Sequence, residues 1–157
     1  MKLQLAYTGL ILLAVLSGGC SDPKSVTDQN TEIVNNNWAY DNKIKYPVKV
    51  ENADITYNLY FNLRVTADYK YSNIFILVHE AGPGMQPSTV RYEFPLANAA
   101  GEWYGAGSGN IYTYQVPFKK GYRFPAGGTY VFEIEQNMRD NPLREVSDVG
   151  LRVEKAQ

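Results

Sequence analysis

The sequence of 157 residues has only one cysteine, Cys20, and only one histidine, His79. One thiol cannot form an internal disulfide, and these two side chains are too few for a typical zinc or copper site. A nucleophilic serine is also missing, because Gly107-Ser108-Gly109 lies in a predicted β context with no helix after it. We therefore expect no enzymatic activity, no metal centre and no cofactor.

The sequence also lacks an excess of charge of either sign. It has 15 lysines and arginines against 16 aspartates and glutamates, for a net charge of −1. Proteins that bind nucleic acid usually present a basic face to the phosphates. The cations of the segment "FKKGYRF" (Lys119, Lys120 and Arg123) adjoin Gly121 and are predicted to lie in a solvated loop. Nucleic acid is thus not an expected partner.

What the sequence does have is a hydrophobic start. Lys2 is followed by an apolar run that is densest at residues 10–16, and the small residues 17–19 precede Cys20. This order is typical of a secretory signal peptide. A membrane-spanning helix needs about 20 apolar residues, more than this run supplies. We predict that residues 1–19 are a signal peptide.

The position of Cys20 resembles a bacterial lipoprotein signal, in which a lipid is attached to the thiol and the chain is cut between Gly19 and Cys20. Ser17 stands where that pattern usually has leucine, and an ordinary cut that leaves a free thiol is the alternative. Acyl chains such as palmitate on Cys20 would hold the protein to a membrane, since each buried methylene contributes about 0.8 kcal/mol.

A lipid on Cys20 predicts a place in the cell envelope. The residues after this cysteine are where bacterial lipoproteins often carry a sorting signal, and Asp22 is the only acidic residue in the stretch 21–24. We therefore expect a periplasm-facing position, with surface display as the alternative. Residues 20–37 are polar and are predicted to form the lipidated N-terminus and a flexible tether. The folded domain is predicted to span 38–157.

That domain shows the alternation of β-strands. In segment 56–66, every second residue is apolar and the intervening residues are mostly polar, as in a strand with one buried face. Segment 128–136 repeats the pattern, and segment 73–78 is apolar on both faces, as in a central strand covered on both sides. Pro47 cannot donate to a ladder and belongs at an edge or a bulge. With Gly/Pro turns between them, the strands predict an all-β fold: one antiparallel β-sandwich, jelly-roll-like or Ig-like.

Two further groups of residues are candidates for ligand contact. Trp103 and Tyr104, flanked by glycines, form an aromatic loop that could stack on a sugar, although burial at one end of the core is favoured for Trp103. Oxygen ligands for calcium occur in segment 136–150, but their spacing matches no calcium loop, and solvated side chains are the favoured interpretation. They are Asn137, Asp140, Asn141, Glu145 and Asp148.

Several segments resemble the gliding motility lipoprotein GldH family of the Bacteroidetes. They are "YNLYFNLRVTADYKYSNIFILV", "GEWYGAGSGNIYTYQVPF", "RFPAGGTYVFEIEQNMRDNPL" and "SDVGLRVEK". The resemblance spans about residues 38–155 and agrees with the position of Cys20. It implies a membrane-anchored, non-catalytic accessory or structural component of the gliding machinery, whose partners are other envelope proteins. The alternative is a glycan-binding envelope lipoprotein that uses Trp103 and Tyr104.

Overall fold

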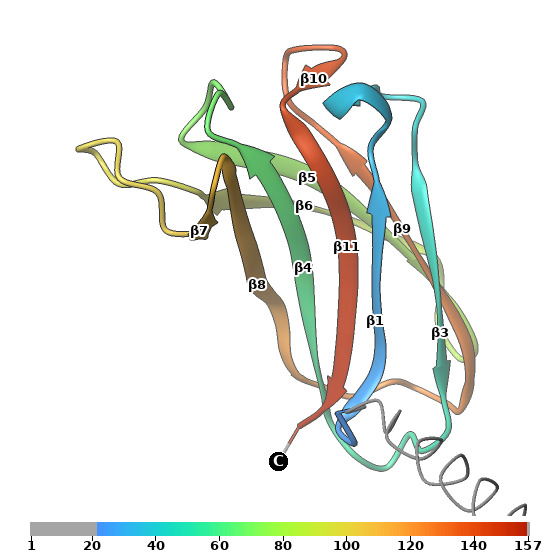
Figure 1. Ribbon diagram of the computed structural model, residues 1–157. Coiled ribbons are helices and arrows are strands. Elements are labelled where there is room, and N and C mark those ends of the chain that lie inside the picture. The colour runs from blue at the N-terminus through green and yellow to red at the C-terminus, as the bar shows by residue number, and fades with distance from the viewer. Residues whose placement is uncertain (1–21, 157) are drawn as a thin grey trace, which may run out of the picture.

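The protein is a sandwich of two antiparallel β-sheets in the computed structural model, which describes residues 22–156 (Figure 1). The larger sheet has the strand order β1-β11-β4-β8-β7, and the smaller has the order β3-β9-β5-β6. Strands β10 and β2 pair as a separate ribbon. In this part of the chain, no helix has the length and apolar character needed to cross a membrane. The predicted antiparallel sandwich is confirmed.

The elements follow one another with short connections. In chain order they are β1 (Ser25–Glu32), the 3₁₀ turn η1 (Val34–Asn36), β2 (Asn37–Trp38), β3 (Ile44–Val50), β4 (Tyr57–Thr66), β5 (Asn73–Ala81), β6 (Ser88–Pro95), β7 (Ala106–Ser108), β8 (Ile111–Tyr122), β9 (Gly128–Gln136), β10 (Leu143–Arg144) and β11 (Val146–Lys155).

The core lies between the two sheets and is built from the alternation seen in the sequence. Strand β4 buries every second residue against the opposite sheet, and β9 does the same from the other side. These inward residues are at most 1% exposed, namely Tyr57, Leu59, Phe61, Leu63 and Val65 of β4 and Tyr130, Phe132 and Ile134 of β9. Burial of such side chains contributes roughly 1.5–3 kcal/mol each, so this interface is the main source of stability.

Two further strand predictions have different outcomes. Pro47 lies on β3, which is an edge strand, as expected for a residue without an N–H. Strand β5 lies inside its sheet between β9 and β6, but no second layer formed by residues 22–156 covers its outer face. Phe75 and Leu77 on that face are half-buried. The guanidinium of Arg91 lies 3.8 Å from the centre of the Phe75 ring, so a neighbouring long side chain provides part of the cover.

The predicted flexible tether over residues 20–37 is wrong from Ser25 onward. Residues 25–32 form β1 and pair with β11 from Ser25↔Glu154 to Glu32↔Asp148. Alternation of apolar residues does not mark this strand, because polar contacts hold it to the sheet. The buried side chain of Asn62 on β4 reaches across β11 and donates to Asp28 at 3.0 Å and to Asn30 at 3.2 Å.

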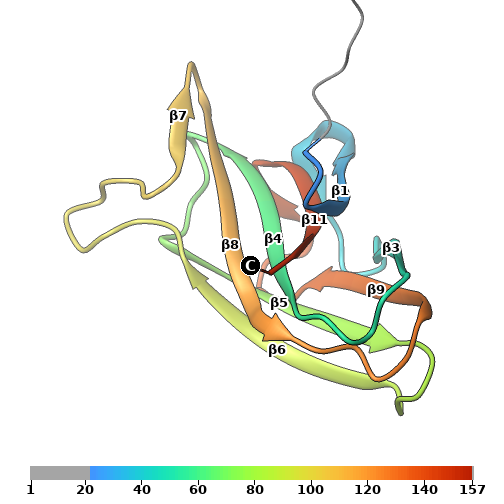
Figure 2. The ribbon, with the colours of Figure 1, turned by 90° about the horizontal axis from the view of Figure 1, so that it is seen from below.

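The two sheets are joined differently at their two sides. On the side of β1 and β3, the hydroxyl of Tyr46 crosses from the smaller sheet and donates to the carbonyl of Val149 at 2.6 Å. Burial raises the pKa of Tyr46 to about 12, which keeps this donor protonated. On the opposite side, the ring of Tyr92 on β6 meets the ring of Phe118 on β8 at 5.3 Å. Beyond that contact, β6 forms the outer margin of the molecule (Figure 2).

Candidate interaction site

Strand β6 is the most exposed long strand of the smaller sheet. Within residues 22–156 it pairs only with β5, in the register Asn73↔Pro95 to Glu80↔Ser88. Its other edge faces outward, and no other strand lies along it in Figure 2. Most of its side chains are exposed, and Val90 is 42% exposed although it shares a face with the buried Phe94. An uncovered strand edge of this kind is a template for pairing with another chain.

The direction of the free backbone groups of β6 follows from its register. The N–H of Leu96 donates to the carbonyl of Ser72 at 2.7 Å, one position beyond the ladder. In an antiparallel pair, the N–H and C=O of a residue point to the same side and alternate along the strand. Even-numbered residues of β6 therefore face β5. The peptide groups of Thr89, Arg91 and Glu93 point away from the sheet.

Pro95 belongs to the same outward set. Because its missing N–H would point away from β5, proline at this position removes no hydrogen bond from the sheet. The free edge thus offers N–H and C=O groups at Thr89, Arg91 and Glu93 and ends at a residue that cannot donate. This arrangement can take one extended strand of about five residues, since the strand needs partners at every second position.

Aromatic side chains hold β6 firmly from the inside. The Phe94 ring stacks on Phe61 of β4, with centres 5.4 Å apart and planes 16° apart. Tyr92 stacks on Phe94 and meets Phe118 edge to face. Such pairs are worth about 0.5–1.5 kcal/mol beyond the area they bury. The edge is therefore presented by a rigid strand, which lowers the entropy lost when a partner pairs with it.

A buried ion pair lies near the start of β6. Glu80 of β5 points between the sheets and is only 4% exposed. Lys119 of β8 forms an ion pair with its carboxylate, and the hydroxyl of Tyr122 donates to Oε1 at 2.8 Å. Burial and then the carboxylate raise the pKa of Tyr122, so its hydroxyl remains a donor. The carboxylate is thereby fully partnered, as a buried charge must be.

This pair corrects one prediction from the sequence. Lys119 was expected in a solvated loop together with Lys120 and Arg123. It instead lies on β8 with its side chain mostly buried against Glu80. Lys120 is exposed, and Arg123 donates to the carbonyl of Asp54 at 2.7 Å. The interpretation failed because the partner of Lys119 is 39 residues away in the sequence.

The only histidine takes part in a surface network of charges. Nδ1 of His79 lies 2.8 Å from the hydroxyl of Thr89, and Nε2 lies 3.3 Å from Glu135 Oε1, outside hydrogen-bond geometry. Burial raises the pKa of Glu135, but the hydrogen bond from Lys43 and the nearby His79 ring outweigh burial and hold this pKa below its ordinary value. Among the described residues, no group of three or more His, Cys, Asp or Glu side chains could hold a metal ion.

Trp103 and Tyr104 lie on the connection between β6 and β7 and differ in environment. Trp103 forms a backbone bridge with Ala97, and its ring packs 5.4 Å from the ring of Tyr112 and 6.5 Å from that of Tyr69. It is half-buried at the margin of the core. Tyr104 is 61% exposed. Of the two aromatics, only Tyr104 presents most of its surface to solvent.

The candidate calcium ligands are bound to protein partners instead of converging. Asn137 accepts from Arg91 at 2.7 Å, Asn141 accepts from the Tyr40 N–H at 3.0 Å, and Glu145 accepts from Thr66 at 2.6 Å. Asp140 pairs with Lys70, and Asp148 accepts from Ser147. Cys20 and Gly19 lie outside the described residues, so the lipid site stays a prediction. The free edge of β6 had only one signal in the sequence, a proline at the end of the strand.

The sequence matches a family of known proteins. The profile of the "GldH lipoprotein" family matches residues 25–153. A "Gliding motility lipoprotein GldH homolog" of Christiangramia forsetii is 30% identical over 155 residues, which cover 93% of each chain. The "Gliding motility lipoprotein GldH" of Flavobacterium johnsoniae is 27% identical over 159 residues, covering 97% of this chain and 98% of that protein. No solved structure matches significantly.

Proposed function

The chain belongs to the GldH lipoprotein family, and we propose that it is a lipid-anchored envelope protein that serves a gliding motility machinery. In this proposal, Cys20 carries the lipid after cleavage behind Gly19. The folded domain faces the periplasm. The protein is a non-catalytic accessory or structural component, whose task is to hold another envelope protein of the machinery.

The free edge of β6 carries this proposal. Binding by strand addition needs an accessible edge, unpaired peptide groups and a rigid strand. Strand β6 meets these needs with the outward peptide groups of Thr89, Arg91 and Glu93, backed by the packed rings of Tyr92 and Phe94. The other edge of the smaller sheet, β3, contains Pro47 and lies beside β1. We therefore assign partner binding to β6.

Affinity purification of the tagged, full-length protein from membranes tests the proposal. We expect envelope proteins of the motility machinery to co-purify, and we expect deletion of the gene to reduce colony spreading in a gliding host. Intact mass of the purified protein should show acyl chains on Cys20, and a Cys20→Ala variant should leave the membrane fraction. Normal spreading after deletion, with no co-purifying envelope protein, would contradict the proposal.

A second candidate function is glycan binding, favoured by the exposure of Tyr104. Sugars bind by stacking on exposed aromatic rings, and Tyr104 offers such a ring on a connection away from the core. A glycan array tests this function with the wild-type protein and a Tyr104→Ala variant. Binding that the variant loses would support it. An array without signal, or binding that Tyr104→Ala does not change, would remove it.

A further inference from the structure

The N-terminal segment that begins at Asp22 is hydrogen-bonded to the rest of the domain from its first described residue onward. The N–H of Ser25 donates to the carbonyl of Asp22 at 3.0 Å, and the N–H of Lys155 donates to the carbonyl of Lys24 at 2.9 Å. The carboxylate of Asp22 accepts from the N–H of Lys24 at 3.0 Å and forms an ion pair with Arg152. These two donors lower the pKa of Asp22, so its carboxylate is charged at neutral pH.

The distance from the proposed lipid site to this fixed point is short. Cys20 and Asp22 are two residues apart, and consecutive Cα atoms of a trans chain are 3.80 Å apart, so the two cannot be separated by more than about 8 Å. A tether extending to residue 37 would have let the domain turn freely above a membrane. Because β1 begins at Ser25, the free length is far too short for that.

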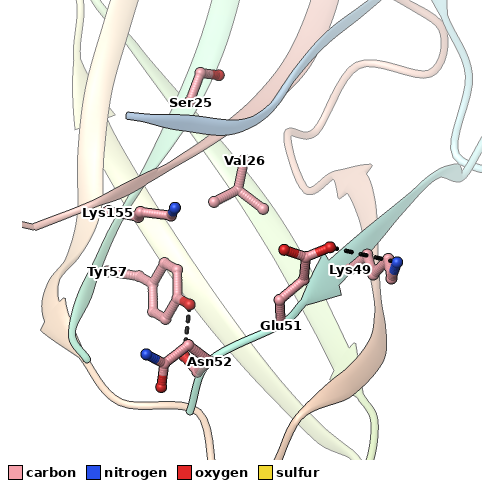
Figure 3. Close-up of a pocket in the computed structure, with 7 residues that line it drawn as sticks. All are labelled: Ser25, Val26, Lys49, Glu51, Asn52, Tyr57 and Lys155. Atoms are coloured by element: carbon pink, nitrogen blue, oxygen red, sulfur yellow. Dashed lines mark hydrogen bonds and ion pairs between the residues drawn. The ribbon is translucent and has the colours of Figure 1, made fainter. Parts of the chain in front are cut away.

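Asp22 lies at one end of the sandwich. The start of β1 lies beside the end of β11, the start of β4 and the connection that follows β3, at the lower end in Figure 1. A hollow of about 320 Å³ opens there (Figure 3). Its lining consists of Ser25, Val26, Lys49, Glu51, Asn52, Tyr57 and Lys155.

We propose that this end of the domain rests directly on phospholipid headgroups, with the hollow turned toward the membrane. This inference depends on the lipid anchor proposed above. The lining suits headgroups that carry both a phosphate and an amine, because Lys49 and Lys155 supply ammonium groups and Glu51 supplies a carboxylate. The pair Lys49–Glu51, at 3.4 Å, is highly exposed on both sides and opens at little cost.

The net charge at this end of the sandwich shows whether electrostatic attraction or the lipid anchor holds it to the membrane. Its charges nearly balance, with six cations against five carboxylates, namely Lys24, Lys49, Lys120, Arg123, Arg152 and Lys155 against Asp22, Asp28, Glu51, Asp54 and Glu154. A surface with so small an excess of cations gains little from anionic lipids. The contact therefore follows from the short covalent link, and it should persist in high salt and be absent without the lipid.

Single-cysteine labels test the orientation, because an acylated Cys20 leaves no other thiol in the protein. A fluorophore is attached to Glu51→Cys beside the hollow or to Val34→Cys, which is exposed at the other end of β1. The eight residues of β1 separate these ends by about 25 Å, at about 3.3 Å per residue. The full-length lipidated protein is placed in vesicles of phosphatidylethanolamine and phosphatidylglycerol that contain a lipid with a nitroxide on its headgroup.

We expect several-fold stronger quenching at position 51 than at position 34, unchanged by high salt. Insertion of about ten Gly and Ser residues between Ser21 and Asp22 should abolish the difference while the protein stays on the vesicles. Equal quenching at both positions in protein whose acylation is verified by intact mass would overturn the orientation. Full-length protein isolated from cells whose intact mass shows no acyl chain on Cys20 would instead overturn the anchor on which the inference rests.

Discussion

Glu80 of β5 and Lys119 of β8 form a buried ion pair that ties the two sheets together near the start of β6. Within the described residues, β7 covers the outer edge of β8 only from Ile111 to Thr113. The second half of β8 is therefore fixed by β4 on one side and by this pair across the core. The position of β6 depends on it, because Phe118 of β8 packs against Tyr92.

Loss of one partner of this pair should destabilise the fold strongly. In Glu80→Ala, Lys119 and Tyr122 lose their acceptor inside the protein, and we expect the free energy of unfolding to fall by about 3–5 kcal/mol. The double variant Glu80→Leu/Lys119→Met removes both charges and should be closer to wild type. Urea denaturation followed by circular dichroism measures both. A single variant as stable as wild type would show that the pair is not needed.

The packing of β1 against β11 can be tested at Gly150. A Cβ at this position would lie 2.5 Å from the carbonyl oxygen of Gln29 and 2.2 Å from Oδ1 of Asn30, so β1 would have to move. We expect Gly150→Ala to cost about 1–3 kcal/mol, as overpacking does, and to increase hydrogen exchange in β1. A second glycine-to-alanine change at Gly109 cannot serve as the control, because Gly109 has a positive φ that strains an alanine by itself. A better control is Ala106→Gly on β7, because Ala106 is exposed and its replacement should leave hydrogen exchange in β1 unchanged.

Tyr46 should make stability depend on alkaline pH. Its pKa is raised to about 12 in the folded protein, against about 10 in an unfolded chain. A raised pKa gives stability that is fully present below pH 10 and is lost as the pH rises toward 12. At neutral pH, Tyr46→Phe should cost about 1–2 kcal/mol for its lost bond to Val149. The gap between wild type and variant should narrow above pH 10, and a constant gap would contradict this account.

A proline on β6 should separate partner binding from folding. The N–H of Thr89 points away from β5, so Thr89→Pro removes a donor from the free edge and none from the sheet. We expect a nearly unchanged thermal transition and loss of the co-purifying envelope partner. Thr89→Ala, which also loses the contact with His79, is the matched control and should keep the partner. Equal recovery with both variants would show that β6 is not the binding edge.

The features that depend on a residue pattern within a single strand could be predicted from the sequence. The alternation of β4 and β9 identified their buried faces, and Pro47 identified an edge, because each signal lies within one strand. Strand β1 was missed because Asp28 and Asn30 are held by Asn62, which is distant in the sequence. Such polar contacts leave no periodic pattern. The lipid site at Cys20 differs from β1, because it is predicted wholly from neighbouring residues in the sequence.

The most direct test of the account is photo-crosslinking from β6 in living cells. A photoreactive amino acid replaces Arg91 on the free edge, and a control places it at Lys45, which is exposed on the opposite edge strand β3. The account predicts a crosslink from position 91 to an envelope protein of the motility machinery that is absent from position 45 and disappears with Thr89→Pro. No adduct at position 91 above the level of position 45, in cells that make the lipidated protein, would contradict it.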